Sequence, residues 1–402
     1  MSGRVARRCT AVPQSVTVAL NDRVKELRAR GTEVLDIGGG DPGFDTPGHI
    51  SAAASDALFA GFTHYTASRG LPELRQAISE KLRRDNGVEA APDTQILVTP
   101  SSKHALFTAL MATLDPGDEV LVPTPSWGSY RSMARLAGAV PVCVELSARD
   151  AFTVTRSRLE EHVSPRTKVL VLNTPNNPTG RVLGAPEADT IAAFAAEHDL
   201  LIITDEIYEK ILFSGEHLSM AARPDCADRT VTVNGFSKGY AMPGWRLGYA
   251  AGPPDIISAM LAVHQHTVAC AGSFVQTGGV AALRGPQGPL REAVRAYAAR
   301  AGLVTRRLNE LVGVVCPAPA GTFYAFADIS GTGIPDGDEF AERLLAEAAV
   351  AVTPGSAFGP GGRGHIRVSF TAGPRVLEEA LARLAAFVRD RAPGRPAPST
   401  RM

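Results

Sequence analysis

The sequence predicts an α/β fold in which a mostly parallel sheet is covered by helices on both faces. Five short apolar runs, rich in β-branched residues, have the pattern of buried strands. Segments with helical periodicity separate them, an alternation typical of parallel sheets whose strands are joined by crossover helices. We predict strands at residues 96–99, 119–122, 168–172, 200–204 and 229–233, and helices at residues 71–84, 101–114 and 185–197.

Local signals mark where these elements begin and end. Pro72 suits the first turn of the first helix, and Gly87 predicts where that helix stops. Residues 115–118, Asp-Pro-Gly-Asp, predict a turn directly before a strand. The chain has 402 residues, 45% hydrophobic and 20% charged, which is enough for one large and one smaller domain.

The last third of the chain changes character. A long helical pattern at 290–311 precedes residues 323–327, which alternate like an antiparallel strand. Further patterns predict a helix at 340–348, a strand at 365–370 and a helix at 376–389. We therefore predict a smaller α+β domain. The expected division is residues 1–45 for an N-terminal arm and part of the small domain, 46–284 for the large domain, 285–391 for the small domain and 392–402 for a disordered tail.

Composition argues against several classes of function. The formal net charge is zero, so nothing indicates a nucleic-acid or anionic-membrane partner. No apolar run is long enough to span a bilayer, and no signal-peptide core follows the basic start. The five cysteines are scattered and odd in number. They predict reduced thiols in the cytoplasm, with neither a disulfide framework nor a metal site.

Lys238 carries the strongest chemical signal. It follows the predicted strand at 229–233, where removal from water favours the neutral amine that forms imines. Ser237 and Arg246 lie close by in a segment broken by glycine and proline, and both can hold an oxyanion such as a phosphate ester. An imine-forming amine beside a phosphate anchor is what pyridoxal phosphate requires.

A second candidate group follows the predicted strand at 200–204. Asp205 would lie at the carboxyl end of the sheet, where ligands bind in α/β folds, and could pair with a protonated pyridine nitrogen. Tyr208, three residues on, could reach the ring hydroxyl. The alternative is a helix N-cap with an acidic first turn. The presence of Lys238 one strand later favours the cofactor-binding role.

The segment from Ser237 to Gly248 resembles the motif S-K-x(4–6)-G-W-R-x-G of the class I and II aminotransferases, a fold type I family of pyridoxal-phosphate enzymes. The resemblance extends over about residues 13–370. It implies pyridoxal 5'-phosphate as cofactor and a large domain with a mostly parallel seven-stranded sheet. It also implies the roles considered above for Asp205 and Tyr208, which lie in a D-E-x-Y motif.

The loop before the predicted helix at 101–114 resembles the phosphate-binding loop of the family. Backbone N–H groups at a helix start, with the hydroxyls of Ser101 and Ser102, make an anion site. Lys103 departs from the small residues usual there and matches a bacterial aspartate aminotransferase branch, in which the lysine faces an acidic substrate side chain. A solvated lysine is the alternative, although the helix dipole disfavours a cation in a first turn.

Trp127 follows the predicted strand at 119–122 and could stack on a flat ring. The family has an aromatic residue at this place, close to both cofactor and substrate. An isolated tryptophan is more often part of a core, which is the alternative.

Further residues are expected to bind the substrate. Arg367 lies in an apolar strand, where a buried arginine needs a partner such as a substrate carboxylate, or else a structural ion pair. Residues 173–180 resemble the family loop N-P-x-N-P-T-G, which implies that Asn177 bonds both the ring hydroxyl and the carboxylate. By the same resemblance, Gly40 lies near the carboxylate, and Thr17 in the arm closes over the substrate.

Tyr65 resembles the family tyrosine that reaches the phosphate of the neighbouring subunit, which implies a homodimer; a plain loop tyrosine is the alternative. Two places depart from the family pattern. Pro243 stands where threonine is usual, and residues 268–272 lack the usual serine and asparagine run. Both departures lie near the expected cofactor pocket, so an atypical substrate would fit them.

We therefore predict an aminotransferase that moves an amino group between an amino acid, of the aspartate or glutamate type, and a 2-oxo acid. The same cofactor could instead support elimination, decarboxylation or oxidation of an amino acid, because these residues activate Cα without deciding which reaction it then undergoes. A dinucleotide site at residues 38–43 fails because prolines follow where a helix must open. A serine hydrolase built on Ser237 fails because Gly239 and Pro243 prevent the required helix.

Overall fold

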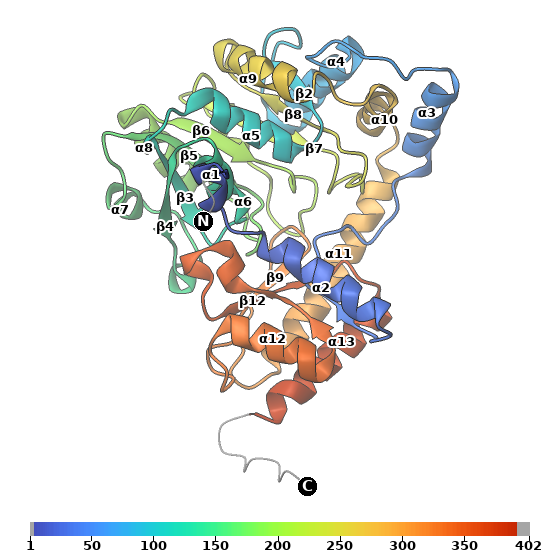
Figure 1. Cartoon of the computed structure of the whole chain (residues 1–402), viewed down its shortest axis with the longest axis vertical. Coiled ribbons are helices and arrows are strands. Elements are labelled where there is room, and N and C mark those ends of the chain that lie inside the picture. Colours follow the sequence, from blue (N-terminus) through green and yellow to red (C-terminus); the bar gives the residue numbers. More distant parts are fainter. Residues whose placement is uncertain (1–3, 392–402) are drawn as a thin grey trace.

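The structure is a computed structural model that describes residues 4–391, so the tail predicted at 392–402 lies outside the described residues. Its large domain is built on a seven-stranded sheet with strand order β2-β8-β7-β6-β5-β3-β4 (Figure 1). Strand β8 runs antiparallel to both of its neighbours, and the remaining strands are parallel. The strands are β2 Ile96–Thr99, β3 Glu119–Thr124, β4 Val140–Glu145, β5 Thr167–Asn173, β6 Leu201–Asp205, β7 Thr230–Gly235 and β8 Gly248–Ala251.

Helices cover both faces of this sheet, as its continuous apolar strands require. One face packs against α5 Ser102–Thr113, α6 Ser129–Leu136 and α9 Pro254–Thr267. On the other face, α7 Arg156–Glu160 and α8 Ala185–Glu197 cover β3 to β6. The same face of β2 and β8 packs against α3 Gly48–Phe59, α4 Pro72–Lys81 and α10 Ser273–Arg284.

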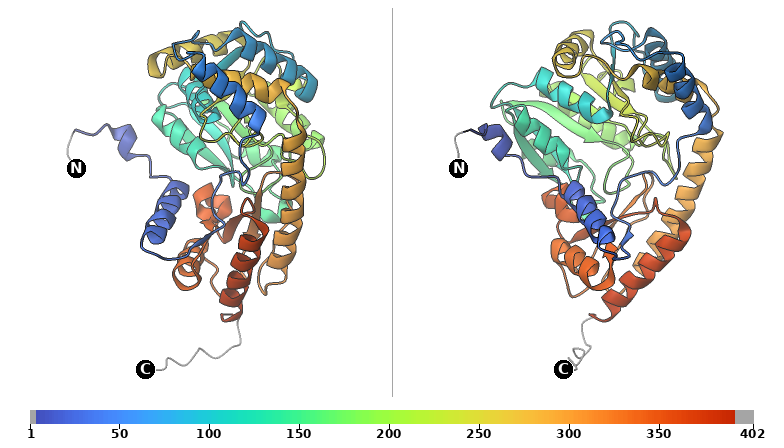
Figure 2. Two further views of the ribbon diagram at one scale, coloured as in Figure 1. Left: turned by 90° about the vertical axis from the view of Figure 1, so that its right-hand side faces the viewer. Right: turned by 45° about the vertical axis from the view of Figure 1, so that its right-hand side comes forward.

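The smaller domain combines segments from both ends of the chain. Its antiparallel sheet has the order β11 Thr353–Pro354, β12 His365–Ser369 and β9 Tyr324–Asp328. Strand β1 Leu35–Asp36 pairs in parallel with β10 Val350–Ala351. The shared core also contains side chains of three helices, α11 Gly288–Asn309, α12 Gly337–Ala348 and α13 Pro374–Arg389. Helix α11 extends along one side of the molecule from the large domain to the small one (Figure 2).

The predicted α/β fold is confirmed, and each predicted strand and helix is present within a few residues. The sequence analysis did not identify β4, β8, α9 and α10. Strand β8 has the sequence Gly-Tyr-Ala-Ala without a β-branched residue, and β4 is an edge strand that is only partly buried. Strand β8 therefore lacks the β-branched run that predicted the other strands, so the one antiparallel member of the sheet was missed. Strand β4 is apolar, Val-Pro-Val-Cys-Val-Glu, but it contains Pro141, which is typical of an edge strand. The domain boundaries stay a prediction.

The helix predicted at 71–84 differs from expectation at its end. Its α-helical part stops at Lys81 and continues as one π-helical turn, η1 Leu82–Asn86. Gly87 ends this turn with a φ of +65°, a conformation that favours glycine. Within residues 4–391, no helix combines the length and the apolar character needed to cross a membrane.

Candidate active site

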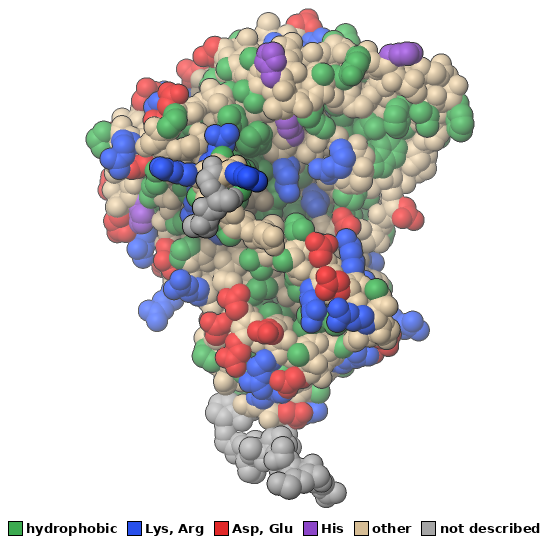
Figure 3. All heavy atoms as spheres, in the orientation of Figure 1, with side chains coloured by type: hydrophobic (Ala, Val, Ile, Leu, Met, Phe, Trp, Pro, Cys, Tyr) green, Lys and Arg blue, Asp and Glu red, His purple; other side chains and the backbone are tan. Residues whose placement is uncertain are grey.

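A cavity of about 640 Å³ lies at the carboxyl ends of β5, β6 and β7, between the sheet, the small domain and helix α2 Val16–Ala29. Ligands bind at this end of parallel sheets. Lys and Arg side chains gather in the hollow between the upper and lower parts of the molecule in Figure 3. Every predicted site residue except Tyr65 lines the cavity, namely Thr17, Gly40, Ser101, Ser102, Lys103, Trp127, Asn177, Asp205, Tyr208, Ser237, Lys238, Arg246 and Arg367.

Lys238 follows β7 and is half-buried. Its Nζ donates a hydrogen bond to the backbone oxygen of Gly40 at 2.6 Å and lies 5.8 Å from the ring centroid of Phe323. A Cβ at Gly40 would lie 2.8 Å from Tyr324 Oη, so a larger residue at this position would displace that hydroxyl. The amine is therefore held inside the cavity by a neutral carbonyl, a bond that a ligand can replace.

Asp205 ends β6, and its carboxylate is buried at the cavity. Tyr130 Oη donates to Oδ2 at 2.7 Å, and the backbone N–H of Ile207 donates to Oδ1 at 3.3 Å. Burial raises the pKa of Asp205 to about 6, although the bond from Tyr130 opposes this shift. A cation bound in the cavity would stabilise the ionised form and return the pKa toward its ordinary value.

Tyr208 lies in the turn after β6 and faces the small domain. Its hydroxyl lies 3.0 Å from that of Tyr324 on β9. Burial raises the pKa of Tyr208 well above its ordinary value, and the neighbouring Tyr324 raises it further. The group is therefore a neutral hydroxyl that can donate or accept one hydrogen bond.

Arg367 lies on β12 and is buried. Its guanidinium donates to Asn177 Oδ1 at 2.9 Å and to the backbone oxygen of Gly38 at 2.6 Å, and it stacks on the Tyr324 ring at 4.1 Å. Nε has no hydrogen-bond partner, and within residues 4–391 no carboxylate forms a salt bridge with Arg367. The structural ion pair considered as the alternative is therefore not present, and the buried charge remains available for an anionic ligand.

One wall of the cavity has the features of an anion site. Helix α5 begins at Ser102, after Ser101 with a φ of +114°, and Ser101 Oγ accepts from the backbone N–H of His104 at 3.3 Å. Ser237 is buried at the same cavity, and Arg246 is exposed at it. These hydroxyls, the N–H groups of the helix start and the guanidinium are the donors that a phosphate ester prefers.

Lys103 and Trp127 lie together at the cavity. The Nζ of Lys103 is 4.9 Å from the Trp127 ring centroid, which is a cation–π distance. Partial removal from water lowers the pKa of Lys103, and the charges of Arg246 and Lys238 lower it further. An anion bound among these cations would relieve their mutual repulsion.

Thr17 and Tyr65 are the two predicted residues that come from the outer parts of the chain. Thr17 lies near the start of α2, where its hydroxyl is 3.0 Å from that of Ser15. Tyr65 lies outside the cavity and is 90% exposed. Its position leaves the ring free to contact another molecule.

The polar residues that line the cavity and that the sequence analysis did not identify include Tyr130, Asn173 and Tyr324. Asn173 donates to the backbone oxygen of Asp205 at 2.9 Å and accepts from the backbone N–H of Asn177 at 2.8 Å. Tyr130 lies three residues after Trp127, and Tyr324 lies in the alternating pattern at 323–327. Neither spacing indicates which distant residue the hydroxyl will contact.

Comparison with known proteins agrees with this geometry. Residues 32–384 match the family described as aminotransferase class I and II. The chain belongs to this family. An aspartate aminotransferase of Musicola paradisiaca (strain Ech703) is 44% identical over 387 residues, which are 96% of this chain and 97% of that protein.

Solved structures of related proteins share the whole fold. The aspartate aminotransferase from Thermus thermophilus with maleate has a TM-score of 0.91 and 41% identity, with 96% of this chain and all of that chain (100%) covered. The aromatic aminotransferase from Pyrococcus horikoshii OT3 has a TM-score of 0.88 and 41% identity, and the match covers 92% of this chain and 99% of that chain. The predicted fold type I and aminotransferase activity are thereby confirmed, and transamination is favoured over elimination, decarboxylation or oxidation.

Aminotransferases of this family use pyridoxal 5'-phosphate, and the residues at the cavity fit it. The ring nitrogen of this cofactor is a base that pairs with a carboxylate, and Asp205 is a buried carboxylate that forms no salt bridge among the described residues. Its phosphate needs several donors, which the start of α5 and Arg246 provide. Its aldehyde needs an amine, and Lys238 lies within the same cavity.

Proposed function

We propose that this aminotransferase acts on an acidic amino acid of the aspartate or glutamate type, with a 2-oxo dicarboxylic acid as its counterpart. The observation that carries the proposal is Lys103, a cation at the cavity that forms a cation–π contact but no salt bridge within residues 4–391. Together with Arg367 it offers two separate cations, which suits a ligand with two carboxylates. The relative from Thermus thermophilus was solved with maleate, a dicarboxylate.

Arg367 is proposed to bind the α-carboxylate of the substrate. Its Nε has no partner, and its other bonds go to neutral oxygens, so a carboxylate would be its first anionic partner. Asn177 is held against the guanidinium and can donate its amide N–H groups to the same carboxylate. This pair would orient the substrate so that its Cα–H bond points to Lys238.

Asp205, Tyr208 and Lys238 are proposed to hold the reactive ring, with Ser101, Ser102, Ser237 and Arg246 around the phosphate. When bound, pyridoxal phosphate provides an electron sink for the electron pair left at Cα. Asp205 would keep the ring nitrogen protonated, and Tyr208 would donate a hydrogen bond to the ring hydroxyl. The Nζ of Lys238, as a free amine, would take the proton from the substrate Cα as a general base and would return it as a general acid.

Trp127, Gly40 and Thr17 are proposed to shape the substrate side of the cavity. Trp127 holds the ammonium of Lys103 beside the cavity. Gly40 gives space for the substrate next to Tyr324, and Thr17 lies on the helix that borders the opening. Closure of this helix over the substrate would exclude water from the reaction.

We also propose that the enzyme acts as a homodimer in which Tyr65 contributes to the neighbouring cavity. The support is that Tyr65 is 90% exposed and that large apolar side chains near it in the chain, Phe59 (87%) and Leu58 (42%), are exposed as well. An exposed group of this kind indicates an interaction surface. The cytoplasmic location stays a prediction.

The test is the visible absorbance of the purified holoenzyme while amino acids are added one at a time. We expect a yellow band that aspartate or glutamate bleaches and that a 2-oxo acid restores. A band bleached only by aromatic amino acids would contradict the acidic substrate. Bleaching with release of ammonia, pyruvate or peroxide would contradict transamination as the main reaction.

A further inference from the structure

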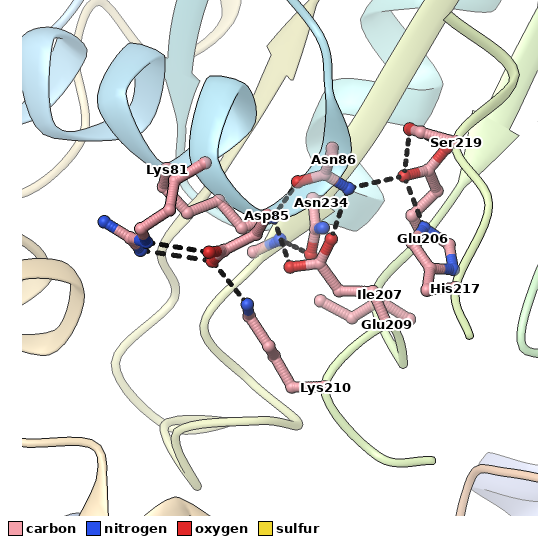
Figure 4. A network of polar contacts seen from close by, with 12 residues as sticks. Lys81, Asp85, Asn86, Glu206, Ile207, Glu209, Lys210, His217, Ser219 and Asn234 are labelled. Atoms are coloured by element: carbon pink, nitrogen blue, oxygen red, sulfur yellow. Dashed lines mark hydrogen bonds and ion pairs between the residues drawn. The ribbon is translucent and has the colours of Figure 1, made fainter. Parts of the chain in front are cut away.

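A buried polar network lies behind the turn that carries Asp205 and Tyr208. Asp205 and Tyr208 line the cavity. Glu206 and Glu209 belong to the same turn and are buried, with exposed fractions of 0% and 8%, but they do not line the cavity. Their carboxylates meet side chains from several distant elements (Figure 4). We define the buried network as Lys81, Asn86, Glu206, Glu209, His217 and Ser219.

Glu206 has donors at both of its oxygens. Ser219 Oγ lies 2.7 and 2.6 Å from the two oxygens, and Thr204 Oγ1 donates to Oε1 at 3.1 Å. His217 Nε2 lies 2.8 Å from Oε2. The backbone N–H of Glu206 donates to Val233 on β7 at 2.9 Å, so the residue also ties the turn to the strand that precedes Lys238.

Glu209 is held by the end of helix α4. It forms an ion pair with Lys81, which is 1% exposed, and it accepts from Asn86 Nδ2 at 2.8 Å. Lys81 Nζ donates to Asn86 Oδ1 at 2.8 Å. Residues five apart share one side of a π-helical turn but not of an α-helix, so the irregular turn η1 Leu82–Asn86 is what brings both side chains to Glu209.

Each carboxylate of the network lies against a basic side chain, Glu209 against Lys81 and Glu206 against His217. Burial would raise the pKa of Glu209, but the neighbouring cations, Lys81 first, lower it to about 2. Burial would lower the pKa of His217, but Glu206 and Glu209 together raise it above its ordinary value. Glu206, Glu209 and His217 each place one possible metal-ligand atom within 4.8 Å of the other two. In this structure the cation next to Glu209 is the ammonium of Lys81.

Such a network is costly to bury, and well-packed apolar residues would often stabilise a fold equally well. Its place directly behind the reactive carboxylate suggests what it does. We infer that Glu206 and Glu209 are positioning residues, through which the buried network holds the turn after β6 and balances its charge, so that Asp205 and Tyr208 face the cofactor. This inference rests on the roles proposed above for Asp205 and Tyr208.

The test compares holoenzyme variants Glu209→Gln and Glu206→Gln with a double variant, Lys81→Met with Glu209→Gln. A matched control is Glu119→Gln, which changes a buried carboxylate with three side-chain partners at the other end of the sheet. For each protein we would follow the visible absorbance of the bound cofactor against pH, kcat and KM, and the urea midpoint of unfolding.

We expect each single network variant to leave a buried positive charge less compensated. This charge repels the proton on the nitrogen that joins Lys238 to the cofactor. That proton is therefore lost more easily, and the midpoint of the absorbance change should move to lower pH by about half a pH unit. The kcat should fall about 10-fold with KM changed less than about 3-fold. Removing Lys81 as well should return the absorbance midpoint toward that of the wild type, since the unpaired charge is then gone.

Three outcomes would overturn the inference. The first is an absorbance midpoint that stays at the wild-type pH in both single variants, and the second is a double variant shifted further than Glu209→Gln. The third is a stoichiometric metal ion in the holoenzyme that Glu209→Gln loses. Failure of the proposed function would look different, because the wild type itself would then show no visible band or no transamination.

Discussion

The two ends of the central sheet each bury a carboxylate, and their environments differ. Glu119 opens β3 at the amino end, where Ser164, Thr167 and Arg166 donate to its oxygens. The bond from Ser164, followed by Arg166 and Thr167, holds the pKa of Glu119 below its ordinary value. Asp205 closes β6 at the carboxyl end, where no cation contacts it within the described part of the chain and burial raises its pKa to about 6.

The difference shows that a buried carboxylate can stabilise the fold at one end of the sheet and remain available to a ligand at the other. A carboxylate whose bonds are complete stabilises the fold and has nothing left to offer a ligand. A carboxylate held beside a cavity without a cation is poorly satisfied until a cationic ligand arrives. The bonds of the carboxylate at the amino end are made by folding alone, whereas the carboxylate at the carboxyl end would gain its cationic partner when the cofactor binds.

The largest expected effect comes from Lys238→Ala. The variant should lose the covalently held cofactor and lower kcat by about 10³-fold or more, because both the attachment point and the proton carrier are removed. Lys168→Ala, at the amino end of the sheet, removes ion pairs with Asp115 and Asp118 and should keep kcat within about 2-fold. Absorbance spectra and turnover assays check both, and retained activity of Lys238→Ala would refute the mechanism.

The second prediction compares the two carboxylates directly. Asp205→Asn should lower kcat about 10²-fold, since an amide cannot hold the ring nitrogen protonated through charge. Glu119→Gln should leave kcat within about 2-fold and act on stability instead. Steady-state kinetics with saturating cofactor measure kcat for both variants. An equal fall in kcat in the two variants would contradict the distinction between the two ends of the sheet.

The third prediction concerns the cation over Trp127. Lys103→Ser should lower kcat/KM for aspartate and glutamate about 10- to 100-fold, because it removes a charge-assisted bond to the side-chain carboxylate. The values for aromatic donors should change less than about 3-fold. A parallel loss for both classes would mean that Lys103 serves the cofactor or the fold and does not select the substrate.

The smallest effect is on stability, and it has opposite signs at the two ends. Because the pKa of Asp205 is raised, its contribution to the free energy of unfolding is intact below about pH 4 and is lost as the pH rises to about 6. Cofactor-free Asp205→Asn should therefore be more stable than the wild type at pH 7 and equal to it below pH 4.

Glu119 should show the reverse dependence. Its lowered pKa means that it stabilises the fold at neutral pH and that this contribution is lost as pH falls through the lowered folded-state pKa. Glu119→Gln should therefore be less stable than the wild type at pH 7, with the difference shrinking in acid. Urea unfolding of the cofactor-free proteins between pH 3 and pH 7.5 checks both variants, and parallel pH profiles would contradict the comparison.

Much of the fold and of the cavity could be predicted because the signals are local. Continuous apolar runs predicted β5, β6 and β7, and the residues just after them, such as Asp205 and Lys238, must meet at one edge of a parallel sheet. Strand β8 escaped because Gly-Tyr-Ala-Ala has no strand signal of its own, and it forms only by pairing with β2 and β7. The contacts of Tyr130 and Tyr324 escaped because they join residues far apart in the chain.

The sequence by itself determined that Asp205 and Lys238 reach the cavity, because each follows a buried parallel strand and so stands at the carboxyl edge of the sheet. Only the tertiary structure decided the state of those groups. Whether Arg367 has an ion pair, or whether Asp205 is held charged, depends on which distant donors pack beside it and on how much water remains. The buried network is the clearest case, since Lys81 and Glu209 are 128 positions apart in the numbering and meet only because a π-helical turn ends α4 behind the turn that carries Asp205.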